Sequence, residues 1–154
     1  MAKLELTKQK LDSAKKAEEY YNALRTNIQL SGDNLKVITI SSVEPSEGKS
    51  TTSTNIALAF ARAGYKTLLI DADIRNSVMS GVFKSRERIT GLTYYLAGTQ
   101  DLSHGLCETS IDNLFVIQSG SPSPNPTALL QSANFGLMIE TLRKYFDYII
   151  VDTA

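Results

Sequence analysis

The chain has 154 residues, which is close to the usual size of one domain and is enough to bury a hydrophobic core. It carries 16 basic and 16 acidic residues, so a nucleic-acid-binding module that relies on bulk positive charge is not expected. The single cysteine and single histidine exclude an internal disulfide and a metal centre built from several such residues.

The first periodic segment covers residues 7–30. Apolar residues recur there at three- and four-residue steps, from Leu11 through Tyr21 and Leu24 to Ile28. The polar run SGDN that follows is typical of a helix end. The sequence therefore predicts a helical arm over residues 1–30 and a separate domain over residues 31–154.

Strand-like and helix-like segments alternate through the rest of the chain. Short apolar runs predict strands at residues 37–40, 67–70, 114–117 and 148–151. Helices are predicted at residues 51–64, 91–98, 101–107, 127–131 and 134–146, with Gly64 as a C-terminal cap of the first. Because the strands are continuous apolar runs, we expect an α/β fold with a mostly parallel sheet covered on both faces. No apolar run approaches the roughly 20 residues needed to span a bilayer, so no direct membrane span is expected.

The segment between the first of these strands and the helix after it carries the strongest chemical signal. It reads VEPSEGKST, and its last residues are Pro45, Ser46, Glu47, Gly48, Lys49, Ser50 and Thr51. In such a loop, backbone N–H groups and the helix N-terminus bind phosphates, a lysine adds positive charge, and a serine hydroxyl binds Mg²⁺. The alternative is an ordinary strand–loop–helix turn that contains Gly-Lys-Ser by accident. The flanking strand and helix favour a phosphate-binding loop.

Two other predicted strands end in aspartate. Asp71 ends the strand of LLIDADIR, with Asp73 two residues later, and Asp152 ends the strand of YIIVDT. The carboxyl ends of parallel strands border the ligand crevice, where carboxylates can hold a metal or polarise a hydroxyl nucleophile. Each aspartate alone could equally be a solvated strand end. Together with the loop, they predict one site that binds phosphates and magnesium.

These three segments resemble the Walker A, Walker A′ and Walker B motifs of the bacterial tyrosine kinases. The segments GLTYYLAGTQDL, NPTALLQS and EEYYNALRTNI also resemble this family, and the likeness covers nearly all of residues 10–154. It is strongest to the streptococcal kinases that regulate capsular and exopolysaccharide synthesis. The resemblance implies the phosphate-loop NTPase fold of the MinD/ParA type and an ATP-dependent autokinase that acts on tyrosine.

The resemblance also implies a role for each matching residue, with ATP and Mg²⁺ as cofactors. Lys49 would contact the β- and γ-phosphates, and Ser50 would bind the metal. Asp73 and Asp152 would support Mg²⁺. Asp71 is the best candidate to activate the tyrosine hydroxyl, although the sequence does not decide between Asp71 and Asp73 for this role.

The arm and the expected partners follow from the same resemblance. The family arm carries Glu-x-x-Arg-x-x-Arg, which helps to assemble a ring of subunits, and this chain has Glu19, Asn22 and Arg25 at those positions. These residues are candidates for homo-oligomer contacts, although one arginine is replaced. The family is activated by the cytoplasmic tail of a membrane adaptor of the polysaccharide chain-length regulator type. We therefore expect a cytoplasmic protein held at the inner face of the membrane by its adaptor.

The sequence departs from the family at its end. The family continues past Walker B into more sheet and a C-terminal tyrosine cluster, whereas this chain stops at Ala154 and its seven tyrosines are scattered. We therefore expect an incomplete kinase domain with little tyrosine phosphorylation of its own. The alternatives are a MinD/ParA-type ATPase switch and a truncated, non-catalytic module that binds nucleotide and adaptor. The PxEGKS form favours the kinase, because partition ATPases usually carry an extra lysine where this chain has Glu44.

Overall fold

A computed structural model describes most of the chain. The described residues are 1–32, 34–41, 49–73, 83–84, 91–96, 105–120, 128 and 130–153. Of residues 49, 50, 83, 84 and 94, only the backbone is described.

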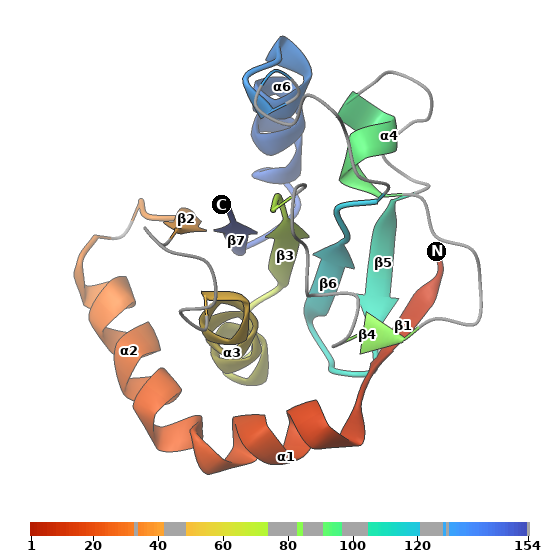
Figure 1. Cartoon of the computed structure of the whole chain (residues 1–154). Coiled ribbons are helices and arrows are strands. Elements are labelled where there is room, and N and C mark those ends of the chain that lie inside the picture. The colour runs from red at the N-terminus through yellow and green to blue at the C-terminus, as the bar shows by residue number, and fades with distance from the viewer. Residues whose placement is uncertain are drawn as a thin grey trace.

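One sheet forms the centre of the molecule (Figure 1). Its strands are β1 (Lys3–Leu6), β2 (Val37–Ile40), β3 (Thr67–Asp71), β4 (Phe83–Lys84), β5 (Leu106–Thr109), β6 (Leu114–Ile117) and β7 (Tyr148–Asp152). Their order across the sheet is β2-β7-β3-β6-β5-β1-β4. The pairs β2·β7, β7·β3 and β3·β6 are parallel, while β5 runs antiparallel to β6. The prediction of a mostly parallel sheet is confirmed.

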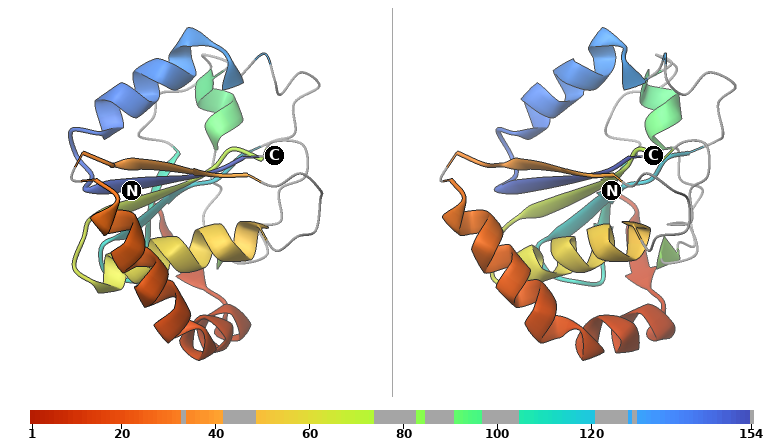
Figure 2. Two further views of the ribbon diagram at one scale, coloured as in Figure 1. Left: turned by 90° about the vertical axis from the view of Figure 1, so that its left-hand side faces the viewer. Right: turned by 60° about the vertical axis from the view of Figure 1, so that its left-hand side comes forward.

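Helices cover both faces of this sheet (Figure 2). Helix α3 (Lys49–Arg62) lies on one face, and α4 (Leu92–Leu96) and α6 (Ala133–Leu142) lie on the other. Helices α1 (Lys8–Lys16) and α2 (Glu18–Leu30) pack outside α3. Side chains of strand β3 alternate between the two faces of the sheet. Leu69 packs on the α3 side, while Leu68 and Ile70 pack on the α6 side.

The arm differs from the predicted single helix over residues 7–30. Ala17, with φ −101° and ψ 7°, separates α1 from α2, and the Thr7 side chain caps α1 by accepting a hydrogen bond from the Lys10 N–H at 3.2 Å. Before the helices, β1 pairs with β5 and joins the sheet. Its signal is a short alternation in which Leu4 and Leu6 are buried. The domain boundary near residue 30 remains a prediction.

The predicted helix over residues 101–107 is wrong at its end. Leu106–Thr109 forms β5, which pairs antiparallel with β6, and the connection between them contains Asn113 at φ 69°. Cys107 and Thr109 point into the core, so the segment alternates between buried and more exposed side chains as a strand does. Residues 101–104 lie outside the described part.

The predicted C-terminal cap of α3 is confirmed. The N–H of Gly64 donates to the Ala61 carbonyl at 3.0 Å, and the N–H of Tyr65 donates to the Phe60 carbonyl at 3.1 Å. Gly64 has φ +95°, a conformation that side chains with a Cβ rarely adopt. The glycine therefore turns the chain from α3 directly into β3.

The arm contains one buried charge, on Lys10 of α1. Its side chain is 7% exposed, and its Nζ has no hydrogen-bond partner within the described part of the chain. Burial lowers the pKa of the Lys10 amine to about 8, because desolvation disfavours the charged form. At neutral pH this residue therefore destabilises the folded chain.

Replacing Lys10 with methionine is expected to raise the free energy of unfolding at pH 7. We expect this gain to be about 2 kcal/mol. It is smaller than the roughly 3 kcal/mol that the same lowering of the pKa would give for an amine fully enclosed by protein. It should disappear between pH 8 and 10.5, because there the folded wild type has released a proton that its unfolded state retains. Urea unfolding from pH 6 to 10.5 measures both effects. Lys8→Met, at an exposed position of the same helix, is the matched control. A gain that does not depend on pH would contradict the prediction.

Candidate functional site

The candidate site lies where three strands end and α3 begins. Strand β2 leads into residues 42–48, and α3 starts at Lys49, as the loop motif predicts. The predicted loop residues Pro45, Ser46, Glu47 and Gly48 lie outside the described part of the chain. The first backbone N–H groups of α3 lack helical partners and carry partial positive charge, and no acidic residue occupies its first turn. This end of α3 therefore favours an anion.

Asp71 and Asp152 lie side by side at this edge. They are register partners on β3 and β7, and their exposed fractions are 1% and 0%. Partners in a parallel pair point to the same face, and the Ser53 hydroxyl of α3 donates to Asp152 Oδ1 at 3.2 Å. Both carboxylates therefore lie on the α3 side of the sheet.

Asp73 lies just past the end of β3. Its backbone N–H donates to Asp71 Oδ1 at 3.2 Å, and its side chain is partly buried. This short turn holds the Asp71 carboxylate at the carboxyl edge of the sheet. The structure thus brings together Asp71, Asp73 and Asp152, the three acidic residues that the sequence predicts for the site.

Backbone hydrogen bonds join the three strand ends into one rigid edge. The N–H of Ala72 donates to the carbonyl of Asp152 at 2.8 Å, and the N–H of Thr153 donates to the carbonyl of Ile40 at 3.0 Å. The Thr153 hydroxyl also donates to Ile40, at 3.3 Å. Groups placed by such an edge keep their relative positions, which a binding site requires.

Ser53 is a site residue that the sequence analysis misses. It is fully buried, as is Thr54, and Asn55 is 4% exposed. These three polar residues follow Thr51, which is exposed, and Thr52 within the first turns of α3. The signal is the run TTSTN, because polar residues inside a buried helix need a partner such as Asp152.

The residues at this edge suit Mg²⁺. Within the described residues, no group of three or more histidine, cysteine, aspartate or glutamate side chains forms a metal cage. Mg²⁺ does not need one, since it usually takes one or two carboxylates and fills its other positions with water and phosphate oxygens. Asp152 and Asp73 can supply these carboxylates, since Asp152 pairs in register with Asp71 and Asp73 is hydrogen-bonded to Asp71. The donor set therefore fits a phosphate-bound magnesium ion.

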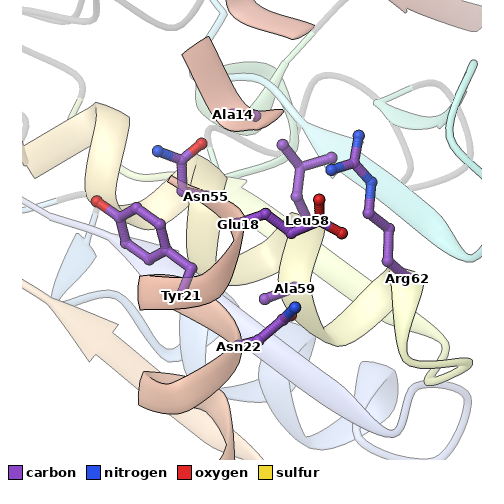
Figure 3. A pocket seen from close by; sticks show the side chains of 8 residues that line it. All are labelled: Ala14, Glu18, Tyr21, Asn22, Asn55, Leu58, Ala59 and Arg62. Atoms are coloured by element: carbon purple, nitrogen blue, oxygen red, sulfur yellow. The ribbon is translucent and has the colours of Figure 1, made fainter. Parts of the chain in front are cut away.

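The predicted oligomerisation residues lie on α2. Glu19 is exposed, while Asn22 lines a hollow between the arm and α3 that has room for about one water (Figure 3). Arg25 is half-buried and donates from Nη1 to Gln29 Oε1 at 2.8 Å. Figure 3 shows Asn22 facing α3, so this side chain belongs to the interface within the chain.

Known proteins are similar to this chain in sequence and in fold. The AAA domain family matches residues 35–154. The tyrosine-protein kinase CpsD of Streptococcus pneumoniae is 76% identical over 154 residues, which cover 100% of this chain and 68% of that protein. No helix in the part of the chain described here is long and apolar enough to cross a membrane.

Solved structures of bacterial tyrosine kinases have a similar fold. The kinase domain of the Escherichia coli tyrosine kinase ETK has a TM-score of 0.81 and 30% identity, over 89% of this chain and 54% of that one. The chimeric protein CapA2B2 has a TM-score of 0.79 and 33% identity, over 88% and 60% of the two chains. MinD from Pyrococcus horikoshii, in complex with Mg-ADP, shares the fold with a TM-score of 0.63. The chain therefore belongs to the bacterial tyrosine-protein kinases, built on the MinD-like phosphate-loop fold.

Proposed function

We propose that this chain binds ATP with Mg²⁺ at the α3 edge of the sheet and transfers the γ-phosphoryl group to tyrosine. The supporting observation is the adjacent pair of buried carboxylates, Asp71 and Asp152, beside the N-terminus of α3. An anion-binding helix end, a metal-binding carboxylate and a carboxylate base at one edge are what phosphoryl transfer needs, since it depends on positioning and on neutralising charge.

Each residue at the edge has a separate task. The loop of residues 45–51 holds the phosphates, with Lys49 as the mobile cation and Ser50 as a metal ligand. Asp152, held by Ser53, and Asp73 support Mg²⁺, which when bound neutralises charge on the phosphates. Asp71 accepts the proton of the tyrosine hydroxyl as that oxygen bonds to the γ-phosphorus; the bond from the γ-phosphorus to the β–γ bridging oxygen breaks, and ADP leaves. Catalysis thus rests on Lys49, Asp71 and Asp73.

The proposal extends to the role of the protein in the cell. We infer that it regulates capsular or exopolysaccharide synthesis, as resemblance to the streptococcal kinases implies. Its partner is a membrane adaptor of the chain-length regulator type, which would hold a cytoplasmic chain at the inner face of the membrane. Contacts between subunits would involve Glu19, Asn22 and Arg25. The side chain of Asn22 would contribute less, because it lies against α3 of its own chain.

A coupled assay tests the transfer step. The chain is incubated with ATP, Mg²⁺ and a tyrosine-rich peptide, and phosphotyrosine and ADP are both measured. We expect slow transfer to the peptide and a loss of at least tenfold in Asp71→Asn, because general-base catalysis typically contributes a factor of about 100 or more. The asparagine keeps an oxygen that can accept the Asp73 N–H.

Asp112→Asn is the control, because this exposed aspartate lies in the connection between β5 and β6. It should leave the rate unchanged. ADP production without phosphotyrosine would instead identify an ATPase switch. Failure to bind nucleotide at all would reject both functions.

A further inference from the structure

One further side chain extends the row that Asp152 and Asp71 begin. Strand β6 pairs parallel with β3 on the side away from β7, with Ile117 beside Ile70 (Figure 1). Gln118 follows Ile117 directly, so one more step of this register places it beside Asp71. Neighbouring strands lie about 4.8 Å apart, which brings Gln118 and Asp71 within reach of one small chemical group.

The alternation of β6 directs Gln118 to the face of the sheet where the carboxylates lie. Val116 packs in the core on the α3 side, and Ile117 packs on the α6 side. The next side chain, that of Gln118, therefore falls on the α3 side. It is half-buried, whereas Asp71 is only 1% exposed. A molecule that approaches Asp71 from this flank would therefore meet Gln118 as well.

Backbone contacts hold the segment that carries Gln118. Its carbonyl accepts a hydrogen bond from the Leu92 N–H at 2.7 Å, and the Ser119 carbonyl accepts one from the Thr93 N–H at 3.0 Å. Gly91 lies so close to the Gln118 carbonyl that it has no room for a Cβ. The Gln118 side chain therefore starts from a fixed point, as a residue that positions a substrate should.

The two flanks of Asp71 differ in chemistry. On the β7 side, Asp152 accepts a hydrogen bond from the Ser53 hydroxyl of α3 at 3.2 Å, and its carboxylate suits a metal ion with phosphates. On the β6 side, Gln118 carries a neutral amide, which can donate and accept hydrogen bonds. A phenol hydroxyl is a neutral partner for such an amide, so the β6 flank suits the tyrosine better than the metal.

We propose that the acceptor tyrosine binds on the β6 flank of Asp71 and that Gln118 positions its hydroxyl. Gln118 Nε2 donates a hydrogen bond to the phenolic oxygen, while the phenolic O–H donates to the Asp71 carboxylate. This oxygen forms the new bond to the γ-phosphorus, the bond to the β–γ bridging oxygen breaks, the proton passes to Asp71, and ADP leaves. The assignment rests on the proposed function, because it takes Asp71 as the base.

Two matched peptides test this contact. A peptide with a single tyrosine, and the same peptide with phenylalanine instead, are titrated against the chain loaded with Mg²⁺ and a non-hydrolysable ATP analogue. We expect the tyrosine peptide to bind more tightly. Gln118→Ala should reduce this preference about fivefold, because one neutral hydrogen bond is lost. Affinity for the ATP analogue should stay the same, because the phosphates lie on the other flank.

A second variant and a control separate this contact from a loss of structure. Gln118→Glu keeps the shape of the side chain but has no N–H to donate, so it should also lose the preference, even if the alanine variant is less stable. Gln9→Ala changes an exposed glutamine of α1 and should bind both peptides like the wild type. Circular dichroism and the unfolding midpoint check that each variant folds.

The outcomes distinguish this contact from the transfer reaction. A wild type without preference for tyrosine, a preference that survives in either folded Gln118 variant, or a preference lost in Gln9→Ala would each overturn the assignment. A preference that depends on Gln118, in a chain that yields no phosphotyrosine in the coupled assay, would support the contact and reject the transfer step.

Discussion

Replacing Lys49 with methionine is expected to weaken ATP binding by about 100-fold. The substitution keeps a side chain of similar length at the start of α3 and removes the positive charge proposed to meet the phosphates. A charge-assisted hydrogen bond to phosphate contributes about 1.5–3 kcal/mol, and 1.4 kcal/mol corresponds to a factor of ten. Titration of a fluorescent ATP analogue in the presence of Mg²⁺ measures the change.

Lys66→Met provides the matched control for this charge. Lys66 is exposed just before β3 begins, at the end of the strand opposite Asp71, and its Nζ lies 5.1 Å from the centre of the Phe146 ring. Its loss should leave nucleotide affinity unchanged and cost no more than about 1 kcal/mol of stability. Equal ATP affinity in wild type and Lys49→Met would show that the loop does not bind phosphate through this residue.

Replacing Gly91 with alanine is expected to destabilise the fold by about 3 kcal/mol. A Cβ at this buried position would lie 2.5 Å from the carbonyl oxygen of Gln118 and would overlap the backbone of Gly120. These are backbone atoms, and they hold α4 in place, since the N–H of Leu92 donates to the Gln118 carbonyl at 2.7 Å. The chain cannot relieve the overlap without losing that contact.

Urea denaturation measures this loss, and Gly136→Ala supplies the comparison. Gly136 lies inside α6, and a Cβ there would meet nothing within 4 Å. Alanine at this position should stabilise the chain by about 0.5–1 kcal/mol, since it favours the helix. Equal stability of Gly91→Ala and the wild type would mean that the backbone of residues 118–120 moves more easily than its hydrogen bonds indicate.

The sequence predicts β2, β3, β6 and β7 because each is a short run of apolar or β-branched residues. Strands β3, β6 and β7 are largely buried, whereas β2 is only partly buried. The sequence also predicts that Asp71 and Asp152 share an edge, since both follow such runs in a parallel sheet. The structure places them in register, while their chemical roles remain predictions. Register itself cannot be read from the runs, because it depends on how neighbouring strands pair.

The missed elements have weaker local signals. β1 and β5 are four-residue alternations; β1 pairs with the distant β5, and β5 pairs with both β1 and β6. Lys10 reads as a surface residue of a charged helix, and only the packing of the arm shows that it is buried. Ser53 likewise gains its role from Asp152, 99 positions later in the chain. Such features depend on tertiary contacts, which a local pattern does not contain.

The pairing of early strands with late ones sets the order in which the fold can be completed. Strand β1 can pair only after β5 has been made, since Lys3 lies beside Glu108. In the same way β2 can pair with β7 only after β7 has been made, since Val37 lies beside Ile149. During synthesis, the strand that leads into the phosphate loop therefore has no described neighbour until the segment around residue 149 leaves the ribosome. Closing such long loops is slow, because their entropy is lost before the contacts form. A nascent chain would therefore gain an ordered candidate site only after the segment of β7 has been translated.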